Sequence, residues 1–258
     1  MYAISKGQRE VTDSDPLTEY VPTSHVGVEI GGGVGLHYHY GTLGQLEHGI
    51  NYAEAYLKSI GRAKPVSRPL KKWPYKRGEP IKLFILAGHR NMEGERAFVQ
   101  ELREIKDKAF LASDNQKIAY KYSLGGAYRK SNGWEPLGLT NYYDSFGPEI
   151  SFGSYLQKRS IHNVAIAKFT HSGSQIIDWT PEGSLAKSRN LYDSFISFVK
   201  NAIQDLNDKG HEVLLEGIFY HLGENDMSFS PHRNNAAKWL DSIIKNSRGD
   251  LKIPSLKW

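Results

Sequence analysis

Hydrophobic residues recur along the chain in two patterns, one typical of amphipathic helices and one typical of buried strands. Between residues 43 and 60 they recur at steps of three and four and are followed by Gly61, which predicts an amphipathic helix. Mainly apolar runs at 82–87, 163–169 and 212–220 each end at a polar turn and predict buried strands. Helical spacing at 191–206 and 236–244 predicts helices between and after them. This alternation predicts a parallel α/β sheet.

The polar turns that follow these strands are the expected location of a functional site. In a parallel sheet, ligands bind beyond the carboxyl ends of the strands, which here are at Gly88, His171 and Gly223. Residues 111–146 are rich in Gly, Ser, Asn and Tyr and have little periodicity. They predict a long functional loop or lid.

Composition excludes several classes of protein. The 258 residues are 39% hydrophobic and 24% charged, which is typical of a globular domain and excludes a disordered or fibrous chain. The absence of cysteine excludes a disulfide scaffold, a Cys-based zinc site and a thiol nucleophile. The first residues lack a signal-peptide pattern, and no stretch approaches the roughly 18 apolar residues of a membrane span. We therefore expect no membrane partner.

The net charge of +5 suggests an anionic partner such as nucleic acid until it is located along the chain. Residues 62–80 contain seven basic residues and one acidic residue, a local balance of +6, which leaves −1 for the rest. Four prolines exclude a regular helix there and predict an extended connector. No surface that interleaves aromatic and basic residues is evident, so nucleic acid is not an expected partner.

Four motifs stand in order at the predicted strand ends. Residues 85–94 (ILAGHRNMEG) resemble the first block of the SGNH/GDSL hydrolases in their sialate O-acetylesterase-like branch, which usually reads LAGQSNMEG. Residues 147–152 (GPEISF), 171–174 (HSGS) with Asp178 and Trp179, and 223–226 (GEND) are similar to later blocks of that branch. The resemblance implies the SGNH hydrolase fold, a flavodoxin-like three-layer sandwich with a parallel sheet, acting on acetylated carbohydrates. It also implies a secreted or periplasmic location.

The order of the blocks is rotated relative to the family. The closing block of the family resembles residues 36–45, followed by the helix to Ile60, rather than a segment after residue 253. Residues 1–61 would then be the C-terminal part of one domain, 62–80 the connector and 81–258 the N-terminal part. The source is either a circular permutation or a piece of a tandem protein with a covalent neighbour domain in a longer chain. Either case predicts that Tyr2 and Trp258 lie side by side in one strand.

The resemblance assigns roles that this sequence only partly retains. In the family a Ser attacks the acyl carbon, a His accepts its proton, an Asp orients the His, and a Gly N–H and an Asn amide hold the oxyanion. Here Arg90 stands at the Ser position, His39 at the base position and Leu36 at the Asp position, whereas Gly147 and Asn225 match the oxyanion pair. Because a guanidinium stays protonated, the usual esterase mechanism is lost at its first step.

We expect Arg90, at the start of a helix, to bind the carboxylate or sulfate of an acidic sugar. Further candidates for the oxyanion and substrate site are His89, Asn91, His171, Glu224 and Trp179. With a uronate carboxylate neutralised by Arg90, His39, Tyr142 or Tyr143 could remove the adjacent proton, which would be lyase chemistry with an ultraviolet-absorbing product. No metal or cofactor is expected.

Simpler interpretations remain beside these. Arg90 could be a structural ion-pair partner of Glu224 or Asp226, and Trp179 could be a core residue. His89 could be only a hydrogen-bonding residue of its turn. A metal site at His37, His39, His221 and Glu224 has unspecific spacing, and Ser172 or Ser174 is an improbable substitute nucleophile. Three function classes follow: a carbohydrate-active enzyme with altered chemistry, an atypical O-acetylesterase and a carbohydrate-binding pseudoenzyme.

Overall fold

The computed structural model describes residues 28–30, 38–40, 49, 52–53, 56, 68–95, 97–125, 129–141, 145–185 and 190–258. The chain divides into two compact units, residues 1–67 and 68–258. In the first unit, strands β1 (Val28–Ile30) and β2 (Tyr38–Tyr40) form an antiparallel pair in which Glu29 lies opposite His39. The predicted pairing of Tyr2 with Trp258 lies outside the described residues, as does most of the helix predicted at 43–60.

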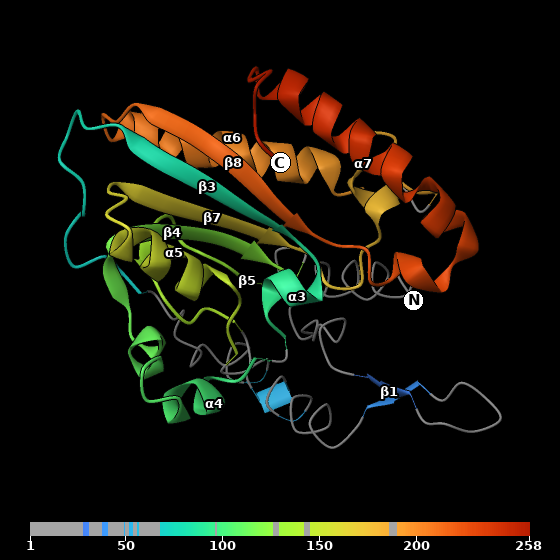
Figure 1. The fold of residues 1–258 in the computed structure, drawn as a ribbon, viewed down its shortest axis with the longest axis horizontal. Coiled ribbons are helices and arrows are strands. Elements are labelled where there is room, and N and C mark those ends of the chain that lie inside the picture. Colours follow the sequence, from blue (N-terminus) through green and yellow to red (C-terminus); the bar gives the residue numbers. More distant parts are fainter. Residues whose placement is uncertain are drawn as a thin grey trace. The chain divides into compact units, whose positions relative to one another are not determined.

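The second unit is built on a mostly parallel sheet (Figure 1). Its parallel strands lie in the order β4-β7-β3-β8, and the short β5 and β6 run antiparallel to β4. The strand bounds are β3 (Ile81–Gly88), β4 (Asn115–Leu124), β5 (Arg129–Lys130), β6 (Glu135–Leu137), β7 (Val164–Thr170) and β8 (Val213–His221).

Helices cover both faces of this sheet. Figure 1 shows α6 and α7 on one face and α5 on the other. The α-helices are α3 (Arg90–Glu93), α4 (Val99–Glu104), α5 (Glu149–Lys158), α6 (Tyr192–Asp208) and α7 (Ser230–Asp250); the 3-10 helices are η1 (Ala109–Ala112), η2 (Ile176–Trp179) and η4 (Asp226–Ser228). No described helix is both long enough and apolar enough to span a bilayer.

Two cores follow from the alternation of side chains along the strands. In β3, Leu83 and Ile85 belong to the core that also contains Phe195 of α6, whereas Leu86 belongs to a second core, against which Phe152 of α5 packs. The strand is therefore apolar on both sides, as expected for a parallel sheet between two helical layers. The predicted α/β three-layer fold is confirmed.

The prediction of a long loop or lid at 111–146 is wrong. This range contains β4, the longest strand of the sheet, together with β5 and β6. Tyrosines and serines dilute the apolar pattern of β4, yet Tyr120 and Tyr122 are buried between the sheet and α5, because aromatic residues suit a pleated, half-buried surface. The two tyrosines considered as bases, Tyr142 and Tyr143, lie outside the described residues.

The C-terminal segment lies beside the outer edge of β8. The N–H of Ile218 donates to the carbonyl of Lys257 at 2.9 Å, and Leu256 is buried in the core. Counting β3, β7, β8 and this segment as strands one to four gives the order 2-1-3-4 of flavodoxin-like sheets, with β4 added outside β7.

Candidate functional site

Three turns meet where β3, β7 and β8 end. The N–H of His89 donates to the carbonyl of His221, and the N–H of His171 donates to the carbonyl of Gly88, each at 3.0 Å. Gly88 has φ +148°, and a Cβ there would lie 2.0 Å from the carbonyl oxygen of His221. Glycine is therefore required for β3 and β8 to approach each other at this edge.

His89 holds these turns together as a neutral side chain. Its imidazole is 1% exposed, and its Nε2 accepts hydrogen bonds from the N–H of Gly173 at 2.7 Å and from Nδ2 of Asn225 at 3.3 Å. Because Nε2 accepts, the ring proton is on Nδ1, which lies 3.7 Å from Oε2 of Glu224. Burial, with the adjacent charge of Arg90 as the second cause, lowers the pKa of His89 to about 4.

Arg90 stands at the entrance to α3 with a side chain that is 38% exposed. Its Nε lies 3.6 Å from Oε2 of Glu95, which is longer than a hydrogen bond, and within the described part of the chain Nε makes none. The ion-pair partner is thus Glu95, and the interpretation that Arg90 pairs with Glu224 or Asp226 is wrong. Since α3 has only four residues, its dipole is small and the guanidinium supplies the positive charge.

A second group of side chains surrounds the carboxylate of Glu224. Oε1 accepts a hydrogen bond from Nδ2 of Asn91 at 2.6 Å and lies 3.2 Å from Nε2 of His221. Glu224 is about one third exposed and His221 is exposed. The structure thus brings the predicted residues His89, Asn91 and Glu224 together and adds His221 to them.

The turn after β7 provides His171 and two buried serines. Nδ1 of His171 donates to the carbonyl of Ser172 at 2.9 Å, which leaves Nε2 as the proton-accepting nitrogen of the half-buried ring. The Ser172 hydroxyl donates to Glu95, and that of Ser174 donates to the carbonyl of His171. Both serines are buried and engaged, which argues against either as a nucleophile.

Trp179 lies in the core rather than at the site. Its indole is 0% exposed, its N–H donates to Ser174 Oγ at 3.0 Å, and its ring contacts Phe169 and Phe195 at centroid distances of 5.6 Å. A ring without exposed surface cannot stack on a sugar, so the core interpretation of Trp179 fits the structure and the sugar-stacking one does not.

The two predicted oxyanion donors are already hydrogen-bonded. The N–H of Gly147 donates to Oε1 of Glu149 at 3.2 Å. Nδ2 of Asn225 donates to His89 and, also at 3.3 Å, to the carbonyl of Ser174. An acyl oxygen could therefore be held by these two donors only if it displaced the hydrogen bonds that they already make.

The motif order and this geometry agree with a comparison against family models. The model for carbohydrate esterases, sialic acid-specific acetylesterases, matches residues 80–258. The chain belongs to this esterase family. The match confirms the family that the four sequence blocks indicate.

Solved structures similar to this esterase-family chain are distant from it in sequence. A protein from Arabidopsis thaliana is 23% identical, over 69% of this chain and 71% of that one, with a TM-score of 0.49. A carbohydrate acetylesterase from Xanthomonas citri is 17% identical (66% and 38%; TM-score 0.44) and NanS is 16% identical (69% and 64%; TM-score 0.46). No curated protein matches.

Some residues that this esterase family would use are not placed relative to Arg90. His39 lies on β2 in the other unit, and its side chain is not among those described. Leu36 and His37 lie outside the described residues. Among the residues that the structure does describe, no group of three or more His, Asp or Glu side chains is arranged to hold a metal ion.

Sequence reasoning missed a buried ionic pair behind α3. Lys168 Nζ lies 2.7 Å from Oε2 of Glu149, with both side chains 0% exposed, and also donates to the carbonyl of Glu93 at 2.9 Å. The Glu93 carboxylate accepts a hydrogen bond from Thr170 Oγ1 at 2.7 Å. A lysine inside the apolar run VAIAKFT was the available signal, because a buried lysine requires a partner.

Proposed function

We propose that this esterase-family chain binds an acidic saccharide through Arg90 and does not cleave acetyl esters by the serine mechanism. The proposal is supported by the guanidinium of Arg90, which the motif resemblance places at the position of the nucleophile. Arg90 is partly exposed and has only a loose contact with Glu95, so its two terminal nitrogens have no hydrogen-bond partner among the described residues. A planar fork of N–H donors suits the bidentate recognition of a carboxylate or sulfate.

The neighbouring side chains suit the hydroxyl groups of a sugar. The Glu224 carboxylate, fixed by Asn91 and His221, can accept hydrogen bonds from hydroxyls. His89 is neutral at physiological pH, so it does not add to the charge of Arg90. A ligand with one anionic group and several hydroxyls matches this combination.

The test is a binding and turnover screen on glycans that contain uronate, sialate, sulfate or only neutral acetylated sugars. Binding is measured by calorimetry, acetate release by a coupled assay and unsaturated products by ultraviolet absorbance. We expect the acidic glycans to bind without either product. Arg90→Ala should weaken binding by between about tenfold and about a hundredfold, because hydrogen bonds to a charged group are lost.

Arg159→Ala serves as the matched control, because the side chain of this exposed arginine, directly after α5, bonds only to the Tyr155 hydroxyl within the described residues. It should bind acidic glycans as the unaltered protein does. Equal binding by Arg90→Ala would contradict the proposal. Acetate release that depends on Arg90 would instead indicate an atypical esterase. An unsaturated product that depends on Arg90 would indicate a lyase.

We also propose that the order of the sequence blocks is rotated relative to the family. The position of Lys257 beside β8 supports this, since the family strand order calls for a further strand there. A chain in which residues 68–258 precede 1–67, with Trp258 joined to Tyr2, should give the same circular dichroism and the same glycan affinity. Failure of that chain to fold would count against the rotated order.

A further inference from the structure

A pocket lies at the amino end of β4, on the opposite side of the sheet's length from Arg90, which follows the carboxyl end of β3. It has a volume of about 410 Å³, within the range of small-molecule sites. β4 has ten residues, so at about 3.3 Å per residue its two ends are about 30 Å apart. The pocket is therefore independent of the site at the carboxyl edge.

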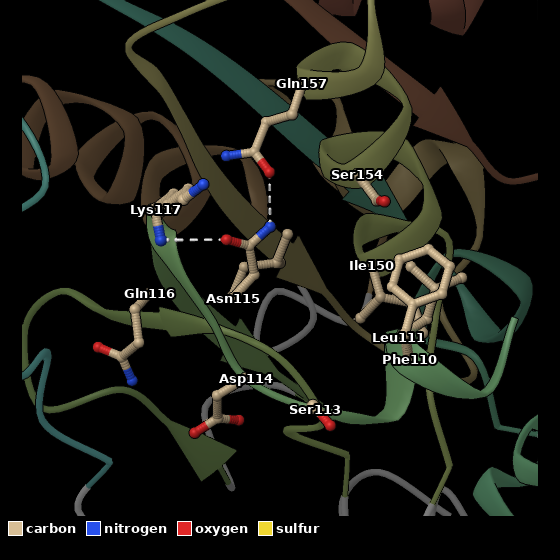
Figure 2. Close-up of a pocket in the computed structure, with 11 residues that line it drawn as sticks. Phe110, Leu111, Ser113, Asp114, Asn115, Gln116, Lys117, Ile150, Ser154 and Gln157 are labelled. Carbon is tan, nitrogen blue, oxygen red and sulfur yellow. Dashed lines mark hydrogen bonds between the residues drawn. The ribbon is translucent and has the colours of Figure 1, made fainter.

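The walls of this pocket differ in chemistry (Figure 2). Phe110, Leu111 and Ile150 gather on one side of the view, and Asn115, Lys117 and Gln157 on the other. Ile150 is buried and Phe110 is 62% exposed at the rim. Because Ile150 and Gln157 are seven residues apart on α5, one face of this helix supplies both an apolar and a polar group.

A chain of hydrogen bonds fixes which way the two amides of the polar wall face. The backbone N–H of Lys117 can only donate, and it donates to Oδ1 of Asn115 at 3.0 Å. Nδ2 of Asn115 then donates to Oε1 of Gln157 at 2.8 Å. With its oxygen engaged, Gln157 presents its Nε2 as a hydrogen-bond donor.

The other polar groups around the pocket also favour a ligand that carries a hydrogen-bond acceptor. The Asp114 carboxylate is paired with Arg68, whereas the ammonium of exposed Lys117 has no ion-pair partner among the described residues. Gln116 resembles Gln157, because its oxygen accepts the N–H of Lys71 at 3.1 Å and its nitrogen remains a donor. The polar wall thus offers donors beside an apolar surface.

We propose that this pocket binds a sugar unit that carries an acetyl group. The carbonyl oxygen accepts a hydrogen bond from Nε2 of Gln157, and the methyl group packs against Ile150. The apolar face of the sugar ring covers the exposed ring of Phe110. This binding goes beyond the role of Arg90 and does not depend on it.

The test is an amide NMR titration of the full chain with N-acetylglucosamine, with an O-acetylated glucose as a second probe and glucose as the control. Shifts should be confined to residues near 110–117 and 150–157, and glucose should produce none there. If only N-acetylglucosamine causes shifts, the pocket prefers an amide carbonyl. If only the O-acetylated glucose does, it prefers an ester carbonyl.

Gln157→Ala and Phe110→Ala should each weaken binding by about tenfold, and Gln157→Glu should weaken it further, because a carboxylate offers no donor. Since Phe110 is exposed, its variant remains informative if a change at Gln157 impairs folding. Arg90→Ala should leave this affinity unchanged while it weakens acidic glycans, so the two proposals fail separately. Equal binding of glucose, no shift with either acetylated probe, or unchanged affinity in the folded variants would overturn the proposal.

Discussion

Arg90 places a fixed cation just after β3, next to side chains that form an ordered site. Its neighbour His89 accepts two hydrogen bonds at Nε2, and Glu95, which contacts Arg90 only loosely, also accepts the hydroxyl of Ser172. The groups that surround the guanidinium are thus held by each other rather than by Arg90. Substitutions at Arg90 should therefore change binding more than folding.

A serine placed at position 90 should not make the protein an active esterase. In Arg90→Ser the new hydroxyl would lack an oriented base, because Nε2 of His89 is already engaged and the resemblance places Leu36 where an Asp should orient His39. We expect acetate release from an activated ester to stay at the level of the unaltered protein. A rise of about a hundredfold or more would show that His39 completes a working site.

His89 should make stability depend on pH. Its folded-state pKa of about 4 lies below the ordinary value of 6.5, so the unfolded chain takes up a proton first as the pH falls. Stability should be highest above about pH 6.5 and should drop between there and pH 4, by on the order of 3 kcal/mol from this group.

Urea unfolding at several pH values measures this effect. His89→Gln is the matched variant, because a glutamine oxygen can accept the N–H of Gly173 without titrating in this range. In this variant the free energy of unfolding should fall less steeply between pH 6.5 and 4, because the contribution of His89 is missing. An unchanged slope in His89→Gln would contradict the protonation state assigned to His89.

At the scale of elements, the turns of the site rest on contacts between β7 and the start of α5. Lys168 lies in the middle of β7, and its partner Glu149 is the first residue of α5. Lys168 also donates to the carbonyl of Glu93, so the same ammonium ties α3 to both. This buried pair joins β7, the start of α5 and the end of α3.

Lys168→Met should destabilise the protein by about 3–5 kcal/mol, because it leaves the buried carboxylate of Glu149 without its partner. The double variant Lys168→Met with Glu149→Gln should recover part of that loss, since it removes the uncompensated charge. Urea unfolding of the three variants, including Glu149→Gln alone, measures the coupling. Additive losses would show that the pair does not act as a unit.

Elements with clear periodicity could be predicted from the sequence, and those with mixed composition could not. β3, β7 and β8 are apolar runs that end at polar turns, and α6 has a regular apolar face. β4 was missed because its tyrosines, serine and lysines resemble loop composition, and their burial depends on α5 and β7. The sequence could also place Glu224 and Asn91 at the carboxyl ends of the strands. It could not reveal the pairing of Arg90 with Glu95, because that pairing depends on how the side chains lie in space.

Across the unit formed by residues 68–258, two candidate ligand sites occupy opposite edges of one sheet. The basic connector contributes to the amino edge, where Arg68 pairs with Asp114 and the N–H of Lys71 binds Gln116. Residues of the basic connector thus contribute to the surroundings of the pocket. The charged groups at the carboxyl ends of the strands are arranged differently. There Arg90 lies near Glu95, and Glu224 lies near His89 and His221.

If Arg90 binds an acidic sugar, its guanidinium must contact the anionic group of that sugar. The most direct measurement is the ¹⁵N-¹H signal of Arg90 Nε in the full chain, assigned by its loss in Arg90→Lys, during titration with glucuronate and with its uncharged methyl ester. We expect glucuronate to shift this signal saturably and the ester to shift it far less. A signal that stays in place with glucuronate, or that responds equally to both, would contradict it.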